Sequence, residues 1–207
     1  MIKKIFLTVL LTVVLTAVMQ AQLKVGARAG FNMTNVWGDF EDTKMKAGFQ
    51  VGMVADYAFS DAISIQPGLL FTTLGYKIDS SLLEETSKST TSFNFNYIQI
   101  PINLHYKLDM GNMKLLLQVG TYLGYGISGK ENSKHNGEKF GGKIEFGSGD
   151  DKLNAFDFGF GAGAGIQFSA MQAVLGYNMG FANLTNSNDM QMKNNGLSLT
   201  LTYLFGK

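Results

Sequence analysis

Two histidines are the side chains of this sequence that could act as imidazole bases. His105 lies on the polar side of an alternating segment, close to Lys107, and His135 lies in a polar stretch between segments. A hydrolase would need one of them held against a nucleophile and oriented by a third group. Ser64 could meet His105, but nothing in the sequence selects that pair. We expect His105 to be an interior polar side chain, and we rank a hydrolase as the least favoured function.

Other chemistry has little support. The chain has no cysteine, which excludes a disulfide framework, a thiolate nucleophile and a Cys-rich zinc site. No metal-ligand spacing appears, and the alternating glycines from Gly159 to Gly165 lack the helix that must follow a phosphate-binding loop. A net charge of +1 leaves no basic surplus for nucleic acid. We predict no enzymatic activity, no cofactor, no metal and no nucleic-acid partner.

The N-terminus indicates export. Lys3 and Lys4 precede an uncharged apolar run from Ile5 to Val18, and Ala21 offers a small residue for cleavage. This is the pattern of a secretory signal peptide. The run is shorter than the ~20 apolar residues that a membrane-spanning helix needs. We predict a cleaved signal peptide over residues 1–21 and an exported domain over residues 22–207.

The exported part alternates between apolar and polar residues with a period of two, which predicts β-strands. One face of each segment carries aliphatic and aromatic residues, and the other carries mostly Gly, Gln, Asn, Ser and Thr. The alternating segments lie near residues 23–32, 47–59, 63–72, 98–107, 115–127, 156–168, 175–181 and 197–205. Eight such segments predict an all-β fold, an eight-stranded antiparallel up-and-down transmembrane β-barrel.

Connection lengths support a barrel in the outer membrane of a Gram-negative cell envelope. Tight turns are expected near Ser60-Asp61, Asp109–Asn112 and Ser169–Gln172. Long loops are expected at Thr34–Met45, Lys77–Ser92, Gly129–Lys152 and Leu184–Lys193. Outer-membrane barrels place short turns in the periplasm and long loops outside. A soluble barrel would instead show a charged, solvated face, whereas most charges here fall in the long loops.

Aromatic residues end the segments that should run toward the periplasm. Rings with one apolar and one wet side suit the membrane interface. All of the aromatic residues at these segment ends lie on the apolar face. We therefore predict a periplasmic aromatic girdle of Tyr57, Phe59, Tyr106, Phe168, Tyr203 and Phe205.

The polar face predicts a network inside the lumen. Arg28 and Asp56 lie at similar heights on neighbouring strands, and a buried arginine without a partner is costly. We expect them to form an ion pair, extended by four glutamines on the polar face: Gln50, Gln99, Gln118 and Gln167. Eight strands leave an interior just wide enough for side chains. We expect this network to fill the lumen, and a gating role is the less favoured alternative.

Two prolines complicate the register. Pro67 and Pro101 lie within predicted strands, where each removes a donor from the ladder. The alternation also changes phase beside them, for example between Phe95 and Ile98. A β-bulge would produce such a change, since one extra residue reverses the facing of those that follow. We predict bulges near both prolines.

Several segments form a recognisable set of motifs along the exported chain. They are Ile65-Gln66-Pro67-Gly68-Leu69-Leu70-Phe71 with Gly75-Tyr76-Lys77, Asn96-Tyr97-Ile98-Gln99-Ile100-Pro101-Ile102, the Gly-rich Phe156–Phe168 segment and a closing Leu-x-Tyr-x-Phe. Together they resemble the PorT-like outer-membrane β-barrel family. The resemblance covers nearly the whole exported chain. It implies the eight-stranded fold and the outer membrane. One namesake of the family is associated with protein secretion, and the family has no shared catalytic motif.

These observations favour a non-enzymatic barrel with a structural, adhesive or secretion and assembly accessory role, exercised through its outer loops. Loops on a rigid scaffold often carry function. Phe140–Phe146 could form an extended hairpin that offers an edge to a partner; a solvated loop is the equal alternative. A narrow pore for small solutes is the second functional candidate. The expected partners are outer-membrane lipid, the barrel-assembly machinery during insertion and a protein bound at the outer loops.

Overall fold

The structure is a computed structural model that describes residues 23–40, 42–79, 89–135, 138–149, 152–186 and 190–206. The predicted signal peptide lies outside these residues. Within them, no helix is long and apolar enough to cross a membrane.

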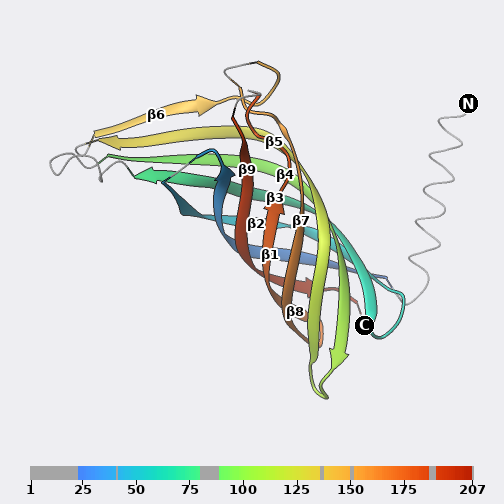
Figure 1. The fold of residues 1–207 in the computed structure, drawn as a ribbon. Coiled ribbons are helices and arrows are strands. Elements are labelled where there is room, and N and C mark those ends of the chain that lie inside the picture. The colour runs from blue at the N-terminus through green and yellow to red at the C-terminus, as the bar shows by residue number, and fades with distance from the viewer. Residues whose placement is uncertain are drawn as a thin grey trace, which may run out of the picture.

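The described chain is built from antiparallel strands (Figure 1). Their bounds are β1 (Leu23–Gly38), β2 (Thr43–Ala58), β3 (Ile63–Asp79), β4 (Ser89–Asp109), β5 (Lys114–His135), β6 (Glu138–Ile144), β7 (Phe156–Phe168), β8 (Met171–Gly180) and β9 (Met192–Leu204).

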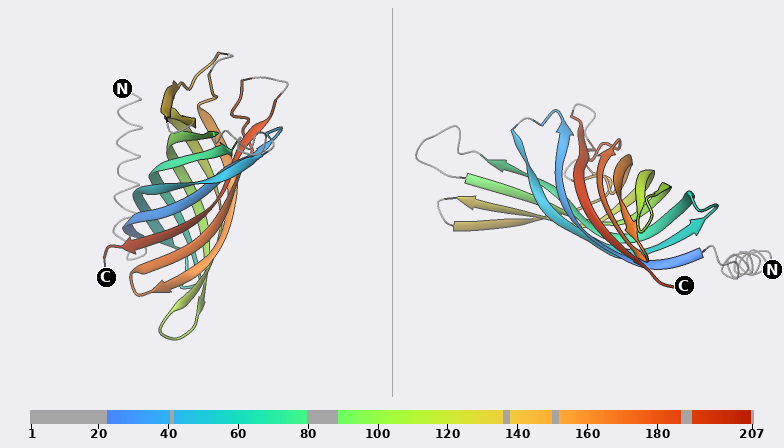
Figure 2. Two further views of the ribbon diagram at one scale, coloured as in Figure 1. Left: turned by 90° about the vertical axis from the view of Figure 1, so that its left-hand side faces the viewer. Right: turned by 90° about the horizontal axis from the view of Figure 1, so that it is seen from below.

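Eight of these strands close into a ring. The sheet runs β4-β3-β2-β1-β9-β8-β7-β5, and β4 also pairs with β5, which closes it. The remaining strand, β6, pairs with β5 alone and lies outside the ring (Figure 2). The predicted eight-stranded antiparallel barrel is confirmed, with β6 added as an extra strand beyond it.

The period-two pattern places side chains as predicted. Along β9, Leu199, Leu201 and Tyr203 are exposed on the outside, while Thr200 and Thr202 are buried inside. The same alternation on the other strands gives the barrel an apolar exterior and a mostly polar lumen. A closed sheet leaves no unpaired edge in the membrane, which is the condition for spanning it with strands.

Short connections gather at one end, which we call the turn end. Ser60 Oγ accepts the N–H of Ile63 at 3.1 Å between β2 and β3. Between β4 and β5, Asp109 accepts the N–H of Gly111, whose φ is +82°. The start of β1 and the end of β9 lie at this end too, since Gly26 pairs with Leu204. We call the opposite end the hairpin end.

At the hairpin end the strands run further than the sequence predicted. The expected loop Thr34–Met45 is mostly strand, because β1 continues to Gly38 and β2 resumes at Thr43. β3, β4 and β5 likewise continue into the expected loops Lys77–Ser92 and Gly129–Lys152. These extensions are rich in Thr, Ser, Asn and Lys, so they lack the apolar contrast that reveals a strand. Their main chains nonetheless pair in register.

The prediction of bulges at the prolines is wrong. Register shifts occur between Met45 and Gln50 and between Asn96 and Tyr97. Around Pro67 and Pro101 the ladder keeps its register. The phase change at Phe95 has another cause: Phe95 and Tyr97 face the lumen and are about 1% exposed.

Close contact between β7 and β8 generates a stability prediction. A Cβ on Gly165 would overlap the carbonyl oxygen of Ala173, whereas a Cβ on Gly176 would meet nothing closer than 3.5 Å. We expect Gly165→Ala to lower the free energy of unfolding by about 1–3 kcal/mol, the usual cost of overpacking. Gly176→Ala is the matched control and should stay close to wild type. Urea unfolding in detergent micelles measures both, and equal stability of the two variants would contradict this packing.

Candidate functional site

A buried carboxylate organises the lumen near the turn end. Asp56 is 3% exposed and accepts hydrogen bonds from Ser64 at 3.0 Å, from Gln66 at 3.1 Å and from Lys107 at 3.0 Å. The Lys107 contact is also an ion pair. Burial of the charged Asp56 is therefore balanced by a cation and by two neutral donors, as a buried ion requires.

Arg28 joins this network through Gln66. Its guanidinium donates to Thr202 Oγ1 at 2.9 Å and to Gln66 Oε1, and Gln66 Nε2 donates onward to Asp56. The predicted direct ion pair between Arg28 and Asp56 is therefore wrong. The register explains why: Arg28 pairs with Gly52, so Asp56 lies four residues further along β2.

The predicted glutamines divide between two places. Gln167 accepts a hydrogen bond from Gln172 Nε2 at 3.2 Å, and Gln172 accepts one from Gln66 at 3.0 Å, so Gln167 continues the Asp56 network. Gln118 contacts His105 at 3.0 Å. Gln118 also lines a cavity further along the lumen, together with Gln50 and Gln99.

Sequence reasoning missed several members of this network, among them Gln66, Lys107 and Gln172. The first two lie on the polar face that the alternation had identified, so their facing was available. Their contacts could not be deduced in this way, because two residues on one face meet only when the strand register places them at the same height along the barrel axis. The sequence predicts Gln172 in a turn, whereas in the structure β8 begins at Met171 and includes it.

Ser64, His105 and Asp56 come together, but their geometry does not form a hydrolytic site. Ser64 and His105 are register partners on β3 and β4, and both are fully buried. The Ser64 hydroxyl donates to Asp56 rather than to the imidazole. His105 Nε2 contacts Gln118, and its Nδ1 lies 3.6 Å from Asp56. A general base must face the proton it removes, and here the hydroxyl proton of Ser64 points to the Asp56 carboxylate and not to the imidazole.

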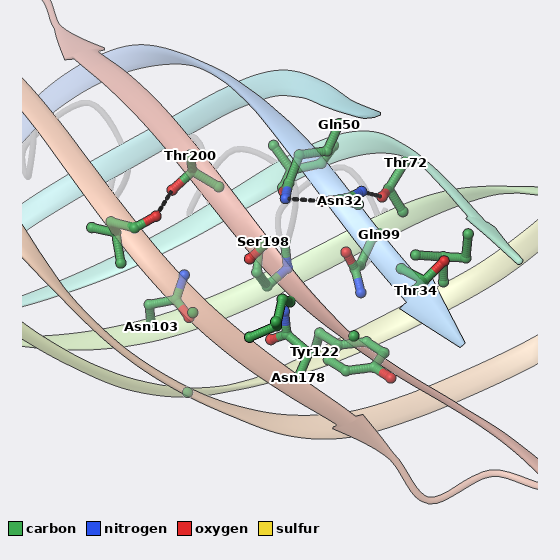
Figure 3. A pocket seen from close by; sticks show the side chains of 18 of the residues that line it. Asn32, Thr34, Gln50, Thr72, Gln99, Asn103, Tyr122, Asn178, Ser198 and Thr200 are labelled. Atoms are coloured by element: carbon green, nitrogen blue, oxygen red, sulfur yellow. Dashed lines mark hydrogen bonds between the residues drawn. The ribbon is translucent and has the colours of Figure 1, made fainter. Parts of the chain in front are cut away.

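A cavity lies in the middle of the lumen (Figure 3). Gln50 donates to Asn32 at 2.8 Å, and Asn32 donates to Thr72 at 3.0 Å across its wall. Gln99, Asn103, Tyr122 and Asn178 also line it. The volume open to water in this cavity is about 60 Å³, which is enough for a few water molecules.

An aromatic plug fills the lumen at the hairpin end. Its buried members are Val36, Tyr76, Phe95, Tyr97, Leu184 and Met192. Phe146, from the connection that follows β6, packs its ring edge-on against Phe95 and Tyr97 at centroid distances of 6.2 and 5.5 Å. Isolated bridges from Phe146 to Leu153 and from Leu153 to Thr185 hold this connection in place. The cavity is therefore bounded by the Asp56 network on one side and by the plug on the other.

The aromatic residues predicted as a girdle all lie on the outside of the barrel near the turn end. Phe59, Tyr106, Phe168, Tyr203 and Phe205 are exposed, at 46–59%. Tyr57 is half-buried, with its ring 5.1 Å from that of Phe59.

A closed antiparallel ring with an apolar outer surface and a polar interior defines a transmembrane β-barrel. Residues 20–186 match the family model described as the outer membrane protein beta-barrel domain, and the chain belongs to this family. The protein is located in the outer membrane. The turn end accordingly faces the periplasm, as in other barrels of this membrane.

Solved structures of small outer-membrane barrels are similar to this chain. Ail from Yersinia pestis is 16% identical, covering 88% of this chain and 98% of its own, with a TM-score of 0.44. Neisserial surface protein A is 15% identical, covering 89% and 98%, with a TM-score of 0.45. OprG from Pseudomonas aeruginosa is 12% identical, covering 89% and 96%, with a TM-score of 0.46. No curated protein matches the sequence.

The Asp56 network generates a second stability prediction. Asp56→Asn removes the negative charge that pairs with Lys107. Arg28, which is linked to Asp56 by Gln66, also loses the nearby negative charge. We expect the free energy of unfolding to fall by about 3–5 kcal/mol, the cost of leaving buried charge uncompensated. Fluorescence of Trp37, the single tryptophan, can follow unfolding in micelles.

Asp61→Asn is the control for this experiment, because Asp61 lies exposed in the turn between β2 and β3. Its stability should remain within about 0.5 kcal/mol of wild type. A loss of the same size in both variants would show that Asp56 has no special structural role.

Proposed function

We propose that this protein is a non-enzymatic outer-membrane platform, a PorT-like barrel that serves a structural, adhesive or secretion and assembly accessory role. The surface responsible is the sheet that projects from the hairpin end, where it binds a partner protein. The observation that carries this proposal is the position of β6, outside the closed ring and paired on one side only.

The edge of β6 is suited to binding by strand addition. β5 pairs one side of β6 through residues 129–135, and the described chain places no strand on the other side. Such an edge presents unpaired N–H and C=O groups to which an extended segment can bond. Phe140 is 59% exposed on this strand and offers an apolar contact beside the edge. The short length of β6 and its lysines limit indiscriminate pairing.

The resemblance to the PorT-like family supports an accessory role in moving or assembling proteins at the cell surface. The barrel supplies a rigid anchor for the projecting sheet, because β4 and β5 run without interruption from the turn end into it. Lipid surrounds the barrel, and the barrel-assembly machinery is the expected partner during insertion.

Site-specific crosslinking tests the proposed partner surface. A photo-crosslinking residue at Phe140, in cells that carry the native outer membrane, should give a discrete protein adduct. Replacing residues 132–142 with a short Gly-Ser linker, and moving the crosslinker to Ile144, should abolish the adduct because the edge is gone. A crosslinker at Met113, in a turn-end connection, is the matched control. Adducts of equal yield with and without β6 would rule out its edge as the binding surface.

A narrow pore is the alternative function, and the contents of the lumen argue against it. A solute would have to displace both the Asp56 network and the aromatic plug. We expect the purified protein to show no large, stable open state in planar bilayers. Steady single-channel currents from the wild-type protein would favour the pore, whereas currents that appear only in Asp56→Asn would show that the network is a seal.

A further inference from the structure

Lysines collect on one face of the projecting sheet. Register places Lys130 of β5 directly opposite Lys143 of β6, and Lys44 of β2 directly opposite Lys77 of β3. Lys134 lies four residues beyond Lys130 on the same face, because alternate residues of a strand share a face. We call Lys44, Lys77, Lys130, Lys134 and Lys143 the lysine face.

Cross-strand register shows that these residues share a face although they come from four strands. Lys77 pairs with Ser92 of β4, and Ser92 pairs with Asn132, which lies between Lys130 and Lys134 on β5. Residues directly opposite one another in a ladder point to the same side of the sheet. Figure 1 shows the ends of β3, β4, β5 and β6 running out together beyond the ring.

The positive charge of this face is largely uncompensated within the described chain. Asp79 forms an ion pair with Lys44 at 2.9 Å, but no described acid pairs with Lys130, Lys134 or Lys143. Glu131 is adjacent in sequence, yet strand alternation turns it to the opposite face. Like charges directly opposite in a ladder destabilise it. The Lys130–Lys143 pair is therefore unfavourable unless an anion lies between the two ammonium groups.

The position of the lysine face indicates the kind of anion that it suits. It continues the outer surface of the barrel, where Ile98, Tyr125 and Ile127 are exposed to lipid. Lys130 lies three residues beyond Ile127, or roughly 10 Å along the strand. A strand tilt of 35–45° reduces this to a height of roughly 7–8 Å. The head-group layer begins at the hydrocarbon boundary and is about 5–8 Å thick. Ile127 is the last apolar residue of β5, and with this residue taken as the hydrocarbon boundary, Lys130 and Lys143 stand at phosphate height.

We propose that the lysine face binds the phosphate groups of phosphorylated lipids in the outer leaflet. Lysines close to a membrane surface attract anionic head groups, and here they extend directly from the lipid-facing wall. A soluble polyanion would need no such continuity with the apolar belt, which is why lipid is the favoured ligand. The inference is independent of the proposed protein partner, because that partner binds the edge of β6 and the lipid binds the outward face.

Lipid retention tests this site. The full barrel is placed in phosphatidylcholine nanodiscs that contain either diphosphoryl lipid A or the same lipid without phosphates, then exchanged into detergent. We expect the wild-type protein to retain the phosphorylated lipid, and Lys130→Gln/Lys143→Gln to retain at least threefold less. Lys24→Gln/Lys114→Gln removes the same charge at the turn end and should retain as much as wild type. Retention should fall with salt, since ionic strength screens exposed charge.

A stability measurement separates this role from a structural one. In nanodiscs without phosphorylated lipid, Lys130→Gln/Lys143→Gln should unfold at the same temperature as wild type or higher, because the like-charge pair is gone. Phosphorylated lipid should raise the midpoint of wild type more than that of the variant. Equal retention by all variants, or equal retention of lipid with and without phosphate, would overturn the proposal. So would a variant that loses binding only to a soluble polyanion such as heparin.

Discussion

The hydrogen-bonded carboxylate of Asp56 is the interaction on which the closed barrel depends most. It lies on β2 and accepts from Ser64 and Gln66 of β3 and from Lys107 of β4. Through Gln66 it reaches Arg28 of β1 and Gln172 of β8. A single buried charge thus links strands from most of the ring. Each of these side chains would be costly in isolation, so the network is stable only as a complete set. It specifies the register while it fills the interior.

The interior is filled, so the proposed function rests on the exterior of the molecule, and the strand lengths show where the sheet projects. Crossing the membrane takes about 9–11 residues of a tilted strand. β8 has 10 residues and β9 has 13, so both end near the membrane boundary. β4 and β5 have 21 and 22 residues and continue well beyond it. The barrel is therefore one-sided: the strands that project all come from one arc of the wall and present both a free edge and a charged face.

Much of the fold could be predicted from the sequence because a membrane barrel imposes a simple rule on every strand. Outward residues such as Leu199 and Leu201 must be apolar, and inward residues such as Thr200 need not be. Beyond the membrane this rule no longer applies. The sequence therefore predicts loops at the extensions of β1 to β5, because their mostly polar residues do not alternate with apolar ones.

The interior was less predictable for two physical reasons. Alternation predicts which face of the sheet a side chain lies on, but it does not predict the height of that side chain along the barrel axis. For this reason the sequence predicts a pair of Arg28 with Asp56, whereas in the structure Arg28 contacts Gln66. The plug was missed for a different reason. Apolar residues were expected only on the lipid side, so Phe95 and Tyr97 suggested a bulge. In the structure they fill the hairpin end of the lumen, where Phe146 packs against them.

The way β6 is attached has a mechanical consequence. β6 is held by its ladder to the outer part of β5, and β5 then continues without a break to the turn end. A partner bound to the edge of β6 and pulled away along the strand direction would load the hydrogen bonds between β6 and β5 in shear, all at once, rather than opening them one at a time. β5 would pass that load to β4 and β7 on either side of it. A partner bound in the proposed way would therefore transmit tension from the cell surface into the wall of the barrel.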